Sequence, residues 1–107
     1  MTDKIETGLL LDYYGSMLTE RQRDVLRFYC DMDFSLSEVA DEFGITRQAA
    51  LDLVARATDK LYTYERKLGL VNKVRKIRFS LEKMIDKTVD ENVKEQLIVL
   101  LSEIKEI

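Results

Sequence analysis

Hydrophobic residues recur at intervals of three or four along the chain, which is the spacing of an α-helix with one buried face. In residues 4–17 this spacing predicts a first helix, and its buried stripe would comprise Ile5, Leu9, Leu10, Tyr13, Met17 and Leu18. Thr19 and Gln22 have the spacing of a capping box, in which each side chain bonds the backbone N–H of the other residue. They predict a second helix that runs to about Cys30.

Two further helix starts lie close together between residues 35 and 61. Ser35 and Glu38 form a second capping-box pattern and open a short helix that ends at Gly44. Thr46 is a suitable N-cap for a long helix that continues to Leu68, with apolar positions at Ala50, Leu53, Val54, Ala57, Leu61 and Tyr64. A short helix, a glycine that accepts a positive φ and a longer helix are the parts of a helix-turn-helix. We therefore expect an all-α fold with a helix-turn-helix core.

A helical pattern resumes after Gly69, which is the natural break in the chain. One helix is predicted from the apolar positions Val71, Val74, Ile77, Leu81 and Met84 or Ile85. Asp90 is placed to cap a last helix, whose apolar positions are Val93, Leu97, Leu100, Leu101 and Ile104. We expect these two helices to fold back as a hairpin. The predicted organisation is a helix-turn-helix domain at 1–69 and a helical extension at 70–107 that packs on this domain or on a dimer partner.

The composition limits the chemistry that the chain can perform. Its 107 residues include no histidine, no proline and one cysteine, Cys30, and the formal net charge is −3. There is no glycine-rich phosphate loop or metal-ligand spacing, so we expect no catalytic residue, cofactor or metal. Without an apolar stretch of ~20 residues or a secretion signal, we expect a cytoplasmic protein that does not enter a membrane.

The exposed start of the second helix-turn-helix helix is the candidate recognition surface. In DNA-binding proteins with this motif, this part of the helix enters the major groove. Arg47 could bond guanine and Gln48 could bond adenine, whereas the carboxylates of Asp52 and Asp59 would repel phosphates. The surface therefore suits either DNA reading or a protein-binding role. The candidate residues for binding nucleic acid or another partner are Thr46, Arg47, Gln48, Ala49, Leu51, Asp52 and Arg56.

Two features of the extension are further candidates for binding. The basic residues Lys73, Arg75, Lys76 and Arg78 could bind RNA phosphates, or they could form a solvated face beside the acidic residues that follow. The apolar run 97–101 is wider than one helix face. It could form a homodimer interface or a layer of the core.

Several short motifs between Leu11 and Leu68 resemble the YlxM family of bacterial helix-turn-helix proteins, whose fold is similar to the fourth region of sigma factors. The family's DYYGxLLT opening is matched by Asp12, Tyr13, Tyr14, Gly15, Leu18 and Thr19. Its DFSLxEIA element is matched by Asp33, Phe34, Ser35, Leu36, Glu38 and Ala40. In its SRQAVYD element, Ala50 replaces valine and Leu51 replaces tyrosine. Any contact that the family makes through that tyrosine is absent here.

The resemblance implies a regulatory binding protein of the signal recognition particle pathway, because genes of this family usually lie beside those for the particle's GTPase and its receptor. The particle's RNA or its GTPase is then the expected partner. The alternative is a sequence-specific DNA-binding transcriptional regulator.

Overall fold

The computed structural model describes residues 3–106, and the chain divides after Leu68 into two compact units. The N-terminal unit contains four α-helices: α1 (Lys4–Tyr14), α2 (Glu20–Leu26), α3 (Leu36–Phe43) and α4 (Arg47–Leu68). A 3₁₀ turn (Gly15–Met17) follows α1, and a π-helical turn (Arg27–Asp31) follows α2. The C-terminal unit contains α5 (Leu70–Lys87) and α6 (Glu91–Lys105). The predicted all-α fold, with a helix-turn-helix core and a C-terminal helical extension, is confirmed.

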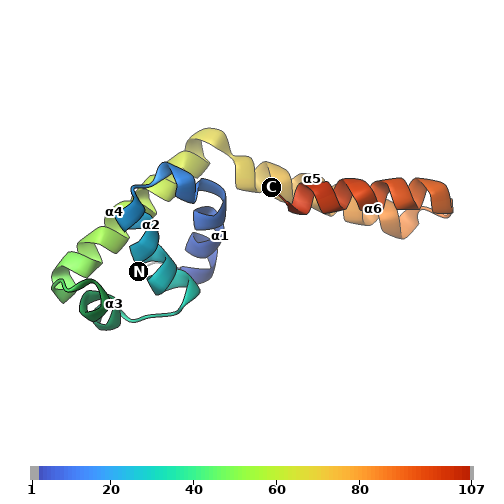
Figure 1. Cartoon of the computed structure of the whole chain (residues 1–107). Coiled ribbons are helices and arrows are strands. Elements are labelled where there is room, and N and C mark those ends of the chain that lie inside the picture. The colour runs from blue at the N-terminus through green and yellow to red at the C-terminus, as the bar shows by residue number, and fades with distance from the viewer. Residues whose placement is uncertain (1–2, 107) are drawn as a thin grey trace. The chain divides into compact units, whose positions relative to one another are not determined.

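In the N-terminal unit, α1, α2 and α3 all pack against the long helix α4 (Figure 1). The helices meet around apolar side chains with at most 1% of their surface exposed, namely Leu11, Tyr14, Val25, Leu26, Val39, Ala50, Val54, Ala57 and Leu61. The hydroxyl of Tyr14 also donates a hydrogen bond to Glu65 Oε1 at 2.6 Å, which joins the end of α1 to the last turns of α4. This core holds α4 in place while its N-terminal turns remain at the surface.

The buried stripe predicted for α1 is partly wrong. Ile5 is 88% exposed and Met17 is 45% exposed, whereas Tyr14 is buried in place of Tyr13. The inward face of α1 instead includes Thr7 beside the predicted Leu10. The α-helix ends at Tyr14 and the chain continues as a 3₁₀ turn, so the helical spacing does not extend to Met17. Within α1 the buried face is formed by Thr7, Leu10, Leu11 and Tyr14, which leaves Ile5 on the opposite, exposed side.

The second helix is also less regular than the spacing of its apolar residues predicted. The capping box at its start is confirmed, because Thr19 Oγ1 accepts from the Gln22 N–H and Gln22 Oε1 accepts from the Thr19 N–H. The regular part ends at Leu26 and gives way to the π-helical turn, which contains Cys30. Burial and the nearby Asp31 carboxylate raise the pKa of the half-buried Cys30 thiol to about 11.

The C-terminal unit is a hairpin of two helices, as predicted. Gly69, at φ +62°, separates α4 from α5, and the Asp90 carboxylate accepts from the N–H groups of Asn92 and Val93 at the start of α6. Helices α5 and α6 pack side by side (Figure 1). No described helix is long and apolar enough to cross a membrane.

Burial in the later part of the chain is smaller than the apolar spacing predicted. Within the described part of the hairpin, only Val71, Val74 and Leu97 are buried apolar residues. About half of the residue surface is exposed at Ile77, Val93 and Leu100, which were predicted to face inward. Of the alternatives Met84 and Ile85, Met84 is 51% exposed and Ile85 is the more covered of the two. The contact between two helices covers only one face of each, so a helical spacing alone overestimates the core.

Candidate nucleic-acid interface

The helix-turn-helix is formed by α3, the turn at residues 44–46 and the first half of α4. At the start of α3, Ser35 Oγ accepts from the Glu38 N–H at 3.1 Å and Glu38 Oε1 accepts from the Ser35 N–H at 2.9 Å. The hydrogen bond from the Ser35 N–H, and after it the Ser35 side chain, favours the ionised carboxylate and lowers the pKa of Glu38. The N–H groups of Ser35 and Glu38 have no carbonyl partner within the helix, and these side-chain hydrogen bonds supply one for each. The position at which α3 begins is therefore fixed.

The turn between α3 and α4 depends on Gly44, which has φ +65°. A side chain at this position would meet no atom within 4 Å, so the glycine is needed for its backbone conformation and not for space. The Ile45 N–H then donates to the Ala40 carbonyl at 2.9 Å and closes the turn. Thr46 Oγ1 accepts from the Ala49 N–H at 3.1 Å and caps α4, as predicted.

The inward face of α4 consists of small and β-branched residues. Ala50, Val54 and Ala57 have no exposed surface, and Ala40 of α3 is 5% exposed. Short side chains allow α3 and α4 to approach closely where they cross. The close packing of this face leaves the opposite face of α4 at the surface.

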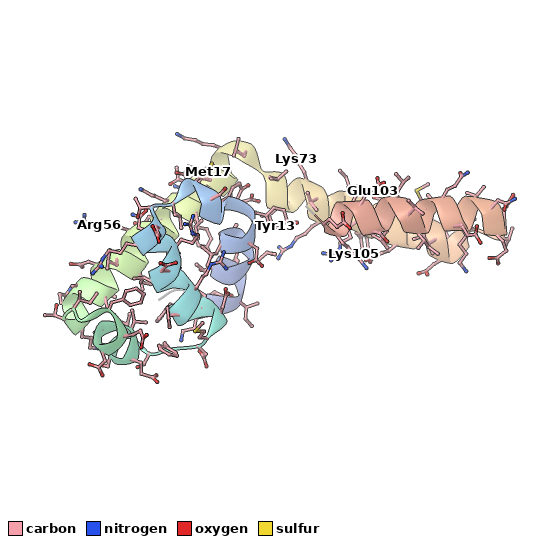
Figure 2. All side chains as sticks on the ribbon, in the orientation of Figure 1. Tyr13, Met17, Arg56, Lys73, Glu103 and Lys105 are labelled. Atoms are coloured by element: carbon pink, nitrogen blue, oxygen red, sulfur yellow. The ribbon has the colours of Figure 1, made fainter. Side chains whose placement is uncertain are left out.

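The seven predicted binding residues lie along the first three turns of α4 and differ in exposure. Thr46, Arg47, Gln48, Asp52 and Arg56 are exposed, whereas Ala49 and Leu51 are half-buried. Gln48 Nε2 donates to Asp52 Oδ1 at 3.2 Å, one turn further along the helix. Within the described part of the chain, the guanidinium groups of Arg47 and Arg56 form no hydrogen bond or ion pair. Both are therefore available to a partner, and Arg56 is labelled in Figure 2.

Exposed acidic side chains lie on the same two helices of the motif. Asp52 and Asp59 are exposed on α4, and Asp41 and Glu42 are exposed on the preceding helix α3. Residues 35–61 contain more carboxylates than cations, so the motif lacks the excess of positive charge that drives nonspecific binding to phosphates. Any nucleic acid bound here must be held by specific contacts more than by charge.

The structure adds two basic residues that sequence reasoning missed. Lys60, one turn after Arg56, donates from Nζ to Gln22 Oε1 at 3.2 Å, which joins α4 to the start of α2. The neighbouring Arg21 lies with its guanidinium carbon 6.0 Å from the centre of the Phe43 ring at the end of α3. Residues 21, 43 and 60 are far apart in the sequence, so no local pattern could have brought them together.

The basic residues predicted in the extension belong to α5, where they do not share one face. Lys73, Arg75 and Lys76 are exposed, and Arg78 is half-buried. At ~100° per residue, Lys73 and Lys76 lie on one side of the helix and Arg75 on the other. Across residues 3–106, no group of three or more His, Cys, Asp or Glu side chains could hold a metal ion.

The fold and this surface define the protein as a helix-turn-helix protein, a class whose members bind nucleic acid or protein partners without needing catalytic groups. Residues 1–101 match the family model UPF0122, described as "Putative helix-turn-helix protein, YlxM / p13 like". The chain belongs to this family.

The alignments with similar proteins cover most of the chain. A UPF0122 protein from Desulforamulus reducens is 47% identical over 79 residues, which are 74% of this chain and 68% of the relative. A UPF0122 protein from Clostridium perfringens strain 13 is 38% identical over an alignment of 109 positions that covers 97% of each chain. One from Clostridium acetobutylicum is 36% identical over 106 residues, which are 99% of this chain and 84% of the relative. The similarity thus includes the C-terminal hairpin.

Proposed function

We propose that this protein is a non-enzymatic regulator that binds nucleic acid through the first three turns of α4. The observation that carries the proposal is the exposed, unpaired guanidinium of Arg47 in the first turn of α4, a helix whose start is fixed by the Thr46 cap and the Gly44 turn. Arg56 is also exposed and unpaired, but nine residues at ~100° each place it on the opposite side of α4. A rigid helix that presents unpaired hydrogen-bond donors is what groove recognition requires.

The finer proposal is that the partner belongs to the signal recognition particle pathway, as the resemblance to the YlxM family implies. The particle's RNA is the first candidate and its GTPase is the second. The excess of carboxylates over cations in residues 35–61 supports a selective partner of this kind, because it weakens attraction to phosphates in general. A regulator of this pathway would work in the cytoplasm.

The second candidate function is that of a sequence-specific DNA-binding transcriptional regulator. It is favoured by the exposed pair Arg47 and Gln48 in the first turn of α4, since arginine and glutamine are the side chains that pair with guanine and adenine in the major groove. In the free protein Gln48 is bonded to Asp52, so reading a base through Gln48 would require this hydrogen bond to open.

Fluorescence anisotropy with three labelled probes tests the proposal: the particle's RNA, a random RNA duplex of equal length and a random DNA duplex. We expect the particle's RNA to bind most tightly. If Arg47 makes a base contact, Arg47→Ala should weaken that binding by roughly 5–150-fold. Arg56→Ala should lower the salt dependence by about one unit if this side chain contacts a phosphate.

Arg66→Ala is the matched control, because Arg66 is exposed on the same helix but lies in its last turn and donates to Thr63. If Arg47→Ala and Arg56→Ala bind every probe as Arg66→Ala does, the proposed surface is wrong. If duplexes selected from a random DNA pool bound tightly and shared a common sequence, this would instead support the transcriptional regulator. Capture of the GTPase that survives nuclease treatment would identify a protein partner and overturn nucleic-acid binding.

A further inference from the structure

We propose that a second copy of this chain docks on the exposed apolar face of the α5–α6 hairpin, so that two hairpins form a four-helix bundle. The proposal goes beyond nucleic-acid binding and does not depend on it. It concerns four side chains that neither the helix-turn-helix nor the hairpin core uses: Ile77, Met84, Val93 and Leu100.

The hairpin does not bury its own apolar surface. Ile77, Met84, Val93 and Leu100 are 48%, 51%, 43% and 48% exposed. An isolated hairpin of two helices has one shared seam, and large aliphatic side chains beside that seam stay in water unless another element covers them. The exposed set is therefore the surface that a further pair of helices would bury.

The four side chains lie on one side of the hairpin. Ile77 follows the buried Val74 by three residues, and Leu100 follows the buried Leu97 by three residues. On two antiparallel helices, residues that follow a buried contact residue by the same number of positions point to the same side of the pair. Met84 lies seven residues after Ile77, and Val93 lies seven residues before Leu100. Both are nearer the connecting turn and continue the same face.

The charges at the two edges of this face select a second copy and its orientation. Beyond Ile77, the edge on α5 carries exposed lysines, including Lys73, whereas the edge on α6 carries the exposed carboxylate of Glu103. Lys73 and Glu103 both lie toward the open end of the hairpin (Figure 2). If the two-fold axis runs parallel to the helices, α5 of one copy packs on α6 of its partner. Lys73 then lies at the same height along the bundle as the partner's Glu103. The other symmetric pairing would place α5 on the partner's α5 and bring lysines together.

The size of the face predicts a dimer of moderate affinity. Helices of this length form a face about 22 Å long and about 20 Å wide. Covering it on both copies buries about 900 Å² in total, which is below the ~1,200 Å² lower limit of stable specific interfaces. We therefore expect micromolar and not nanomolar dissociation, so the dimer should form only at raised protein concentration.

Sedimentation equilibrium of the full chain at increasing concentration tests this proposal. The expected result is a rise from 12.5 kDa to twice that mass. Ile77→Glu and Leu100→Glu should each weaken association at least about tenfold, because each buries a charge in the interface. Phe79→Glu is the matched control, since Phe79 is 58% exposed on the same helix but lies away from this face. Circular dichroism should show unchanged helix content in all three variants.

A charge-swap experiment tests the orientation. Lys73→Glu alone and Glu103→Lys alone place like charges opposite each other at both symmetric positions, and each should weaken the dimer about threefold to tenfold. An equal mixture of the two variants should recover wild-type association, because every opposed pair then has opposite charges. A failure of the mixture to recover overturns this orientation.

Three outcomes would overturn the dimer itself. The chain could sediment at 12.5 kDa at every concentration, as it would if this face packed on the chain's own N-terminal unit or waited for an unrelated protein. It could form species larger than a dimer. It could also lose association as readily with Phe79→Glu as with Ile77→Glu.

Discussion

Replacing Gly44 by alanine tests whether the helix-turn-helix depends on one backbone conformation. The residue has φ +65° and ψ +36°, and an added Cβ would meet no atom within 4 Å, so Gly44→Ala creates no steric clash. The cost is the left-handed conformation itself, which is about 1–2 kcal/mol for a residue with a Cβ. Alanine also restricts the unfolded chain, which offsets about 0.4–1 kcal/mol. We expect a net loss of about 1 kcal/mol in the free energy of unfolding.

Tyrosine fluorescence during urea unfolding measures this loss in the N-terminal unit, which contains Gly44. The chain has five tyrosines and no tryptophan, and all five lie at or before residue 64, within the N-terminal unit. The signal therefore reports this unit without a contribution from the hairpin. For a domain of this size, a loss of 1 kcal/mol lowers Tm by roughly 4–8 °C.

Gly44→Asn is the matched control, because asparagine tolerates the left-handed region better than alanine does. It should cost less than Gly44→Ala although its side chain is larger. The reasoning would be refuted if alanine were as stable as glycine, or if asparagine were the more damaging of the two. A loss above about 3 kcal/mol would mean that the turn contains a steric constraint that the open space around Gly44 does not explain.

Three further predictions concern other contacts of the N-terminal unit. Tyr14→Phe removes the 2.6 Å hydrogen bond to Glu65 and should lower the free energy of urea unfolding by about 1.5–3 kcal/mol at neutral pH; an unchanged midpoint would contradict this. Because folding lowers the pKa of Glu38, its contribution is present above the ordinary value of 4.5 and is lost as pH falls through the lower folded pKa. Glu38→Gln should therefore flatten the acid side of the stability profile, and an equally steep profile would contradict the capping box. A Cys30 pKa of about 11 instead of 9.0 leaves about a hundredfold less thiolate at pH 8, and the higher nucleophilicity of the more basic thiolate offsets about tenfold of this. A disulfide reagent should therefore react about tenfold more slowly with folded than with urea-unfolded protein. Equal rates would show that the thiol is not shielded.

Sequence spacing predicted the helix starts better than it predicted which side chains are buried. The capping residues Thr19, Ser35, Thr46 and Asp90 act as expected, since a cap and its partner lie within three residues of each other. The buried stripe of α1 was partly wrong: Met17 lies in a 3₁₀ turn that begins at Gly15, and within α1 the other helices cover the face of Leu11 and Tyr14 and not that of Ile5. A change of helix type of this kind depends on packing against other helices and leaves little trace in the local sequence.

The candidate recognition surface was predicted in part. The exposed positions of Arg47 and Arg56 follow from the helix-turn-helix pattern, and the structure agrees. The contributions of Arg21 on α2 and Lys60 on α4 were missed, because Arg21 reaches Phe43 and Lys60 reaches Gln22 only after the helices have packed. Whether the surface binds RNA, DNA or protein stays a prediction.

The amino-acid sequence by itself determined the helices, their caps, the Gly44 turn and the membership of the UPF0122 family, because these features depend on residues close together in the chain. The tertiary structure decided which apolar residues are covered. It shows that Ile77 and Leu100 remain half exposed although their spacing matches that of core residues. The physical reason is that burial requires a neighbouring element, and a helical period states which face is apolar but not whether another helix lies against it.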